Sequence, residues 1–135
     1  MQSRSIFRGV SAVLIGGLVL TACDLDDAEA RRQRLHLPPL GFQGNATDGK
    51  SLYDQQCVTC HGQYGEGSDQ APALVHRVYA SSHHADLAFH LAVRDGVKQH
   101  HWHFGDMPPL PDLSPEATEH IVVYMRQLQR QAGIQ

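Results

Sequence analysis

One short stretch constrains the fold of this chain more than any other feature, because it gathers two cysteines and a histidine. Cys57 and Cys60 are separated by two residues, and His61 follows the second cysteine directly. Residues three apart on a helical turn lie on the same side, so both thiols can reach one partner while the imidazole lies beside them. Cysteine and histidine are also the commonest soft or borderline metal ligands. The fold must therefore enclose the group that these three side chains bind.

The spacing C-x-x-C-H is the attachment signature of c-type haem. Two thiols at this spacing can reach the two vinyl groups of one porphyrin, and the adjacent imidazole then lies beneath the iron and ligates it. Three other interpretations compete. A thioredoxin-like redox dithiol needs a βαβ pattern and a zinc site needs a second pair of ligands, and neither is evident around Cys57 and Cys60. The third alternative is a structural disulfide between the two cysteines.

The first 22 residues have the pattern of an export signal rather than of a folded element. Arg4 and Arg8 supply a positive segment without an acidic residue. The apolar run over residues 10–20 is too short to cross a bilayer as a helix, which takes about 20 residues. Export also fits covalent haem attachment, because that reaction takes place outside the cytoplasm.

Residues 20–23, Leu-Thr-Ala-Cys, resemble the bacterial lipobox, in which the signal is cleaved before a cysteine that first receives lipid. The resemblance implies a lipid anchor on Cys23, and an ordinary secreted protein is the alternative. Asp24 is similar to the inner-membrane retention signal of enterobacterial lipoproteins. The expected location is therefore the periplasmic side of a bacterial membrane, with the inner membrane favoured. The three cysteines of the chain then account for one lipid and two thioethers.

Length and charge exclude several classes of protein. The 135 residues amount to about one domain. The net charge is −3 and the chain has no long basic run, so nothing in it favours binding to nucleic acid. Removal of the two arginines in the export signal makes the net charge −5, which predicts salt-sensitive docking to a basic partner.

The expected fold is all-α, because no region alternates apolar and polar residues with the period of a strand. Residues 23–46 lack strong periodicity and are expected to form a solvated tether, or else a short helix on a membrane, ahead of a domain over residues 47–135. Capping residues and periodicity predict at least three helices. They cover residues 48–59 behind an N-cap at Thr47 or Asp48, residues 85–94 before Gly96, and a last helix from Ser114 to about Gln131, ending at Gly133.

Three further motifs extend the pattern around the cysteines. Gly49, Tyr53 and Cys57 follow one another at intervals of four and share one helix face. Residues 71–74 are Ala-Pro-Ala-Leu, and residues 105–109 are Gly-Asp-Met-Pro-Pro. Together with C-x-x-C-H, these motifs make the chain from residue 47 onward resemble a class I c-type cytochrome of the small bacterial monohaem kind. The resemblance implies three or more helices wrapped around one covalently attached haem c.

The resemblance also implies roles for single residues. In the family, the proline carbonyl of A-P-x-L accepts a hydrogen bond from the ligating histidine, so Pro72 is expected to orient His61. The Gly-Asp-Met-Pro-Pro stretch looks like the family's distal-ligand loop, so Met107 is expected to be the second axial ligand of the iron. Met125 is the alternative methionine, but it lies within a helical pattern, where methionine usually belongs to the core.

The haem is expected to supply apolar bulk to a core that would otherwise be marginal. Its predicted neighbours are Tyr53, Leu74, Leu91, Trp102, Phe104 and Leu110. The family's C-terminal helix crosses the first helix near its glycine, which places Tyr124 beside Gly49 and Tyr53. Trp102 is expected either to donate its indole N–H to a haem propionate or to act as a hydrophobic plug.

Nine histidines besides His61 exceed what a cytochrome of this kind needs. Three interpretations stay open. The histidines are solvated surface residues, or one of His100, His101 and His103 replaces Met107 as the sixth ligand of the iron. The third interpretation is a second metal such as copper or zinc, for which His100 and His103 are close enough in sequence.

The function expected from these features is that of a membrane-tethered carrier of single electrons between a redox donor and a redox acceptor. The chain is not expected to be an enzyme by itself, although it can serve as a subunit of an oxidoreductase complex; otherwise it is expected to be a monomer. Two alternatives belong to other classes of protein. One is a haem protein that senses or binds a small gas at a weakly held sixth position, and the other is a histidine-rich lipoprotein that handles metal.

Overall fold

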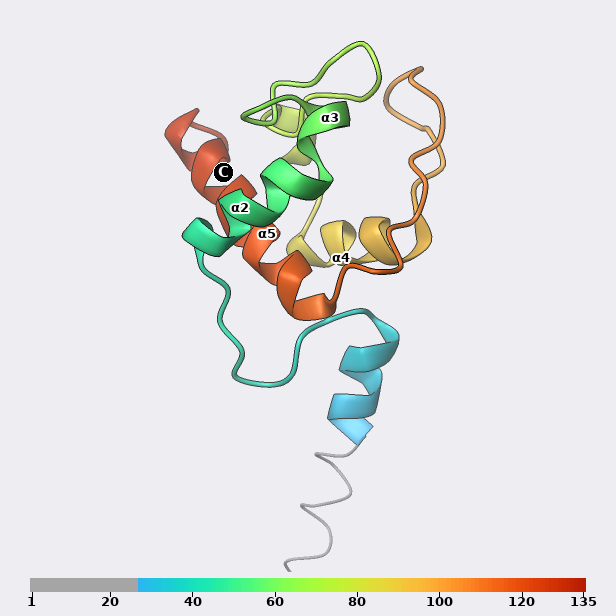
Figure 1. Cartoon of the computed structure of the whole chain (residues 1–135), viewed down its shortest axis with the longest axis vertical. Helices are drawn as coiled ribbons and strands as arrows, with labels where there is room; N and C mark the ends of the chain where they lie inside the picture. The colour runs from blue at the N-terminus through green and yellow to red at the C-terminus, as the bar shows by residue number, and fades with distance from the viewer. Residues whose placement is uncertain (1–26) are drawn as a thin grey trace, which may run out of the picture.

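The computed structural model describes residues 27–135, which form the helical body in Figure 1. The expected export signal, Cys23 and Asp24 lie outside the described residues. The described elements are α2 (Ala46–Gln56), α3 (Val58–His61), the 3-10 helix η1 (Arg77–Tyr79), α4 (Asp86–Asp95) and α5 (Pro115–Gln131), with a further helical stretch over residues 27–34. Between residues 27 and 135 the structure has no strand, only one isolated bridge between Val97 and Met107. The all-α expectation is confirmed.

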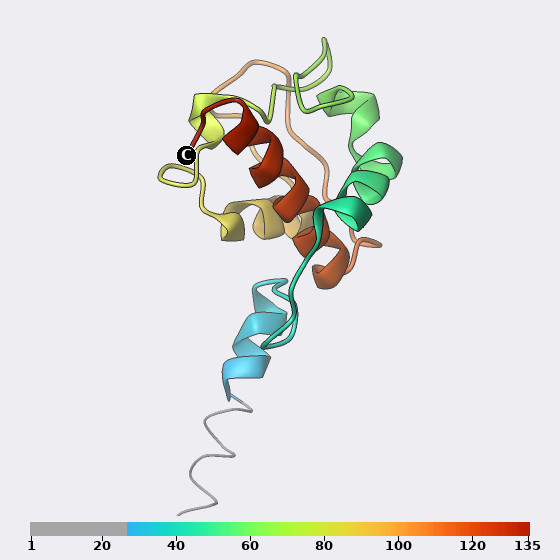
Figure 2. The same ribbon diagram turned by 90° about the vertical axis from the view of Figure 1, so that its left-hand side faces the viewer.

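Helix α5 is the centre of the fold, with α2 on one side and α4 on the other (Figure 2). The crossing of α2 and α5 depends on Gly49. A Cβ atom there would lie 2.0 Å from the carbonyl oxygen of His120 and 2.9 Å from the Cβ of Tyr124. Only a glycine lets the two backbones approach this closely.

The core between α2 and α5 is aromatic. The rings of Tyr53 and Tyr124 meet edge to face, with their centroids 5.7 Å apart. Met125 is fully buried in the same cluster, together with Ile121. The predicted position of Tyr124 beside Gly49 and Tyr53 and the core position of Met125 are therefore confirmed.

The helix ends follow their capping residues. The side chain of Ser114 accepts a hydrogen bond from the N–H of Ala117 at 3.2 Å, so α5 begins where it was predicted. The predicted cap of the first helix is wrong, because Asn45 takes that place and accepts from the N–H of Asp48 at 2.9 Å. Helix α2 consequently begins two residues earlier than expected and ends before Cys57, where the chain turns into α3.

The segment before α2 is partly helical, which departs from the solvated tether that was expected and agrees in secondary structure with the alternative of a short helix. Residues 27–34 are helical and stand at one end of the molecule, away from the other helices, in both Figure 1 and Figure 2. The Arg32 side chain donates to the carbonyl of Pro38 at 2.6 Å, and Pro38 is fully buried. The His36 ring lies 3.3 Å from the hydroxyl of Thr118 in α5. The hydrogen bond from Arg32 to Pro38 is local, whereas His36 and Thr118 are 82 residues apart, and local composition gives no sign of such a contact.

Arg126 fixes the connection between η1 and α4 onto α5. Its guanidinium is largely buried and donates to Asp86 at the start of α4, to the carbonyl of Tyr79 and to the carbonyl of His84. Gln129 adds a bond to the carbonyl of Leu74 at 2.9 Å. In the part of the chain that the structure describes, every helix is too short or too polar to span a bilayer.

Candidate functional site

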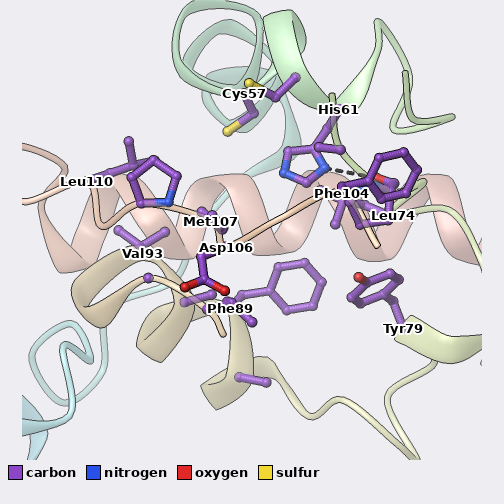
Figure 3. Close-up of a pocket in the computed structure, with 18 of the residues that line it drawn as sticks. Cys57, His61, Leu74, Tyr79, Phe89, Val93, Phe104, Asp106, Met107 and Leu110 are labelled. Atoms are coloured by element: carbon purple, nitrogen blue, oxygen red, sulfur yellow. Dashed lines mark hydrogen bonds between the residues drawn. The ribbon is translucent and has the colours of Figure 1, made fainter. Parts of the chain in front are cut away.

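A cavity of about 430 Å³ opens between α3, α4, α5 and the loop that leads from α4 to α5. Four residues that the sequence singled out line it together: Cys57, Cys60, His61 and Met107. Figure 3 shows side chains from α3, from α4 and from the loop converging on this space. The lining is mostly apolar, and the size is that of a small-molecule or cofactor site.

The imidazole of His61 is held from one side. Its Nδ1 lies 2.9 Å from the carbonyl oxygen of Pro72, the contact drawn as a dashed line in Figure 3. A carbonyl oxygen only accepts, so Nδ1 carries the proton and donates it, which leaves Nε2 with a free lone pair. Burial lowers the pKa of His61, although the Pro72 carbonyl opposes the shift, so the ring is neutral at pH 7. The predicted hydrogen bond to Pro72 is confirmed.

Tyr53 corrects one expectation. It does not line the cavity; its ring belongs to the core between α2 and α5. Its hydroxyl instead donates to the carbonyl of Gly62 at 2.8 Å, directly after His61. Gly62 has φ +79°, a value that a residue with a side chain rarely adopts. Tyr53 thus stabilises the turn that ends α3 and, through that turn, helps to position His61.

The two cysteines differ in their surroundings. Cys57 is partly buried and Cys60 is exposed, and both are free. Burial, with a smaller contribution from Cys60, raises the pKa of the Cys57 thiol to about 11. A redox dithiol of the thioredoxin kind needs a lowered thiol pKa, and its βαβ surroundings have no counterpart in residues 27–135. The raised pKa of Cys57 and the helical surroundings therefore argue against a catalytic dithiol.

Met107 reaches the cavity from a closed loop. Val97 and Met107 exchange two backbone hydrogen bonds of 2.9 Å each, which pin the two ends of the loop together. Gly96 allows this closure, because a Cβ there would lie 2.4 Å from the carbonyl oxygen of Met107. Within the loop, the Lys98 ammonium pairs with the Asp106 carboxylate at 2.5 Å, and that hydrogen bond lowers the pKa of Asp106.

Five of the six predicted neighbours of the cofactor line the cavity: Leu74, Leu91, Trp102, Phe104 and Leu110. Sequence reasoning missed Tyr79, Phe89 and Val93, which also line it. Phe89 and Val93 lie four residues apart on α4, and that helical spacing was the available signal.

The indole of Trp102 tests whether a cofactor fits here. Its Nε1 is buried and has no hydrogen-bond partner among the described residues. A buried N–H without a hydrogen-bond acceptor destabilises the fold, unless a ligand supplies that acceptor. A ligand with an anionic edge would supply that acceptor, so Trp102, the two thiols and the free lone pair of His61 all fit a haem.

Most of the surplus histidines fall into two groups. Several have structural partners: the His90 Nε2 lies 2.9 Å from a Glu119 oxygen, and His120 accepts from the N–H of Asn45 at 2.9 Å. A second group, His83, His84, His100 and His101, gathers beside the cavity. Of the three histidines considered as replacements for Met107, His100 and His101 line the cavity and His103 does not.

These features define the class of protein. An all-helical domain places a C-x-x-C-H segment, a histidine oriented by a proline carbonyl and a methionine loop around one apolar cavity, which is the design of a c-type cytochrome. Residues 46–129 match the family model described as Cytochrome c, so the chain belongs to the cytochrome c family. Members of this family bind haem covalently and carry electrons between redox partner proteins, which indicates electron transfer rather than catalysis for this chain. No curated protein and no solved structure matches the chain significantly.

Proposed function

We propose that this chain carries single electrons with one haem c, which Cys57 and Cys60 hold through thioethers and which His61 and Met107 ligate. The observation that carries the proposal is that these four side chains line a single cavity. The haem, when bound, supplies a one-electron couple between ferrous and ferric iron. Every other part of the function depends on how the chain binds, orients and shields that group.

His61 is the proximal ligand in this proposal. The hydrogen bond from its Nδ1 to the Pro72 carbonyl fixes the tautomer and the ring orientation, and it makes Nε2 a better donor. Because Tyr53 braces the following turn, the ring has little freedom to tilt. An electron carrier benefits from such rigidity, since its ligands must keep nearly the same geometry in both oxidation states.

Met107 is the distal ligand in this proposal. Its backbone is fixed by the bridge to Val97, and Pro108 and Pro109 stiffen the chain that follows. A thioether is a weak, neutral ligand, so it needs this support to remain on the iron when the charge changes. The apolar lining and the neutral sulfur together favour a fairly high reduction potential.

Trp102 completes the pocket in this proposal by donating its unpaired indole N–H to a haem propionate.

The location and partners rest on the sequence alone. A lipid on Cys23 would tether the protein to the periplasmic side of a bacterial membrane, with Asp24 favouring the inner one. The acidic charge would guide docking to basic faces of a redox donor and acceptor, in a monomer or in a subunit of an oxidoreductase complex.

The test is an optical spectrum of the purified protein, matured in a host that attaches c-type haem. We expect a c-type α-band on reduction with dithionite and a weak far-red band from thioether ligation in the oxidised state. Met107→Ala should lose the far-red band and bind carbon monoxide readily, whereas Met125→Leu, a volume-conserving change in the core, should retain the wild-type spectrum. Wild-type protein that binds carbon monoxide as readily as Met107→Ala would instead support a gas-binding haem protein, and the absence of haem would refute the proposal.

A further inference from the structure

Two loops far apart in the sequence bring histidines together outside the proposed haem ligands. His83 and His84 come from the turn before α4, and His101 comes from the loop that Val97 and Met107 close. One ring nitrogen from each of these three residues lies within 4.8 Å of the others. The ring of His100 lies next to them, with its centroid 4.3 Å from that of His101.

The turn that carries His83 and His84 is held firmly. The backbone N–H groups of both residues donate to the carbonyl of Ala80, at 2.9 and 2.8 Å. The carbonyl of His84 accepts from the buried guanidinium of Arg126. The cluster therefore has one fixed wall, and His101 on the loop supplies the other.

His84 is oriented as metal-binding histidines usually are. Its Nδ1 lies 2.7 Å from the carbonyl oxygen of Val78, which can only accept, so Nδ1 donates and Nε2 keeps its lone pair. A ligating histidine almost always gives its second N–H to a carbonyl or carboxylate in this way. His100 has the same arrangement, with its Nδ1 2.8 Å from the carbonyl of Lys98.

We propose that His83, His84 and His101 bind one divalent transition-metal ion of the zinc and copper class, with His100 or water as a fourth ligand. Imidazole suits these metals, while the group of three that the structure brings together contains no carboxylate of the kind that calcium or magnesium requires. Tetrahedral zinc with bonds of about 2.0–2.1 Å keeps its nitrogen ligands roughly 3.3 Å apart, so small side-chain rotations close the site. His83 and His101 are exposed, which gives an ion a way in.

The proposed metal site is separate from the haem ligands and does not depend on the proposed electron transfer. His84 and His101 also line the cavity, so the ion would lie at its edge, while Cys57, Cys60, His61 and Met107 remain available to the haem. The experiment uses the haem-loaded protein, because thioether-bonded cysteines cannot compete for the metal.

The probe is Zn²⁺ alone, which has no redox chemistry, titrated into the haem-loaded protein and followed by calorimetry. We expect one Zn²⁺ per chain, with an affinity at least tenfold lower in His83→Gln and in His101→Gln. Both variants change exposed side chains, so folding should survive. His103→Gln is the matched control, since this exposed histidine belongs to the same loop but not to the cluster.

Three results would overturn the proposal. The first is an absence of saturable Zn²⁺ binding to the wild-type protein. The second is an equal loss of affinity in His103→Gln and His101→Gln, which would indicate unspecific binding to loop histidines. The third is a change of axial ligation in the haem spectrum of His101→Gln before any metal is added, which would place that imidazole on the haem iron instead.

Discussion

The wall of the cavity that carries His61 and the wall that carries Met107 are held by different kinds of contact. The His61 wall is held by the close crossing of α2 and α5, by packed aromatic rings and by the hydrogen bond of a buried tyrosine hydroxyl. The Met107 wall is a loop closed by two backbone hydrogen bonds and an exposed ion pair. One wall is part of the core, whereas the other is a local structure attached to it. Substitutions in the His61 wall should therefore change the free energy of unfolding of the whole domain. Substitutions in the Met107 wall should change only the local stability of the loop.

The largest expected effect is that of Gly49→Ala. The new methyl group would meet the carbonyl oxygen of His120 at 2.0 Å, and backbone atoms on a packed helix cannot move aside cheaply. We expect the free energy of unfolding to fall by about 3 kcal/mol, even though alanine is the better helix former. Urea unfolding followed by circular dichroism measures the change. Gln56→Ala, an exposed change in the same helix, is the control. A stability equal to that of the control would show that the crossing is looser than described.

A smaller effect is expected from Tyr53→Phe. The ring stays in the core, but the carbonyl of Gly62 loses its hydroxyl donor. Loss of one such hydrogen bond should lower the free energy of unfolding by about 1 kcal/mol. Tyr64→Phe removes an exposed hydroxyl and should leave stability unchanged in the same unfolding measurement. Equal free energies of unfolding for the two variants would show that the Tyr53 hydroxyl does not stabilise the turn after α3.

The smallest global effect is expected from Asp106→Asn, which removes the ion pair with Lys98. We expect amide hydrogen exchange to become faster at Val97 and Met107, while the global unfolding midpoint stays at the wild-type value, as it should for the exposed control Asp112→Asn. Unchanged exchange at both amides would show that the ion pair does not hold the loop.

Acid should act on the wild-type loop in the same way as that substitution. The pKa of Asp106 is lowered from its ordinary value of 3.8, chiefly by the hydrogen bond from Lys98. Its contribution is thus fully present above pH 3.8 and is lost as the pH falls through the lowered pKa. The protection of the Val97 and Met107 amides, taken relative to their intrinsic exchange rates at each pH, should fall over that acidic range in the wild-type protein and not in Asp106→Asn.

The sequence predicted local patterns well and long-range contacts poorly. Capping, spacing and the family resemblance predicted the all-α class, the start of α5 and the hydrogen bond from His61 to the Pro72 carbonyl. The cap at Asn45 was missed because three neighbouring residues have capping side chains and the choice between them depends on packing. The contact of His36 with Thr118 and the meeting of His83 with His101 were not predictable, since each depends on how segments separated by a helix or more are brought together. Tyr53 was placed beside the haem because helix periodicity gives the face of a residue but not the neighbour that covers it.

The bridge between Val97 and Met107 also bears on how this protein can change over time. A loop whose two ends are joined can gain or lose residues between them without moving the side chain at its end. The entropic cost of a longer loop is small, about 0.6 kcal/mol for each doubling of its length. Lineages could therefore change loop residues that do not line the cavity, such as His103, while the position of Met107 is inherited unchanged.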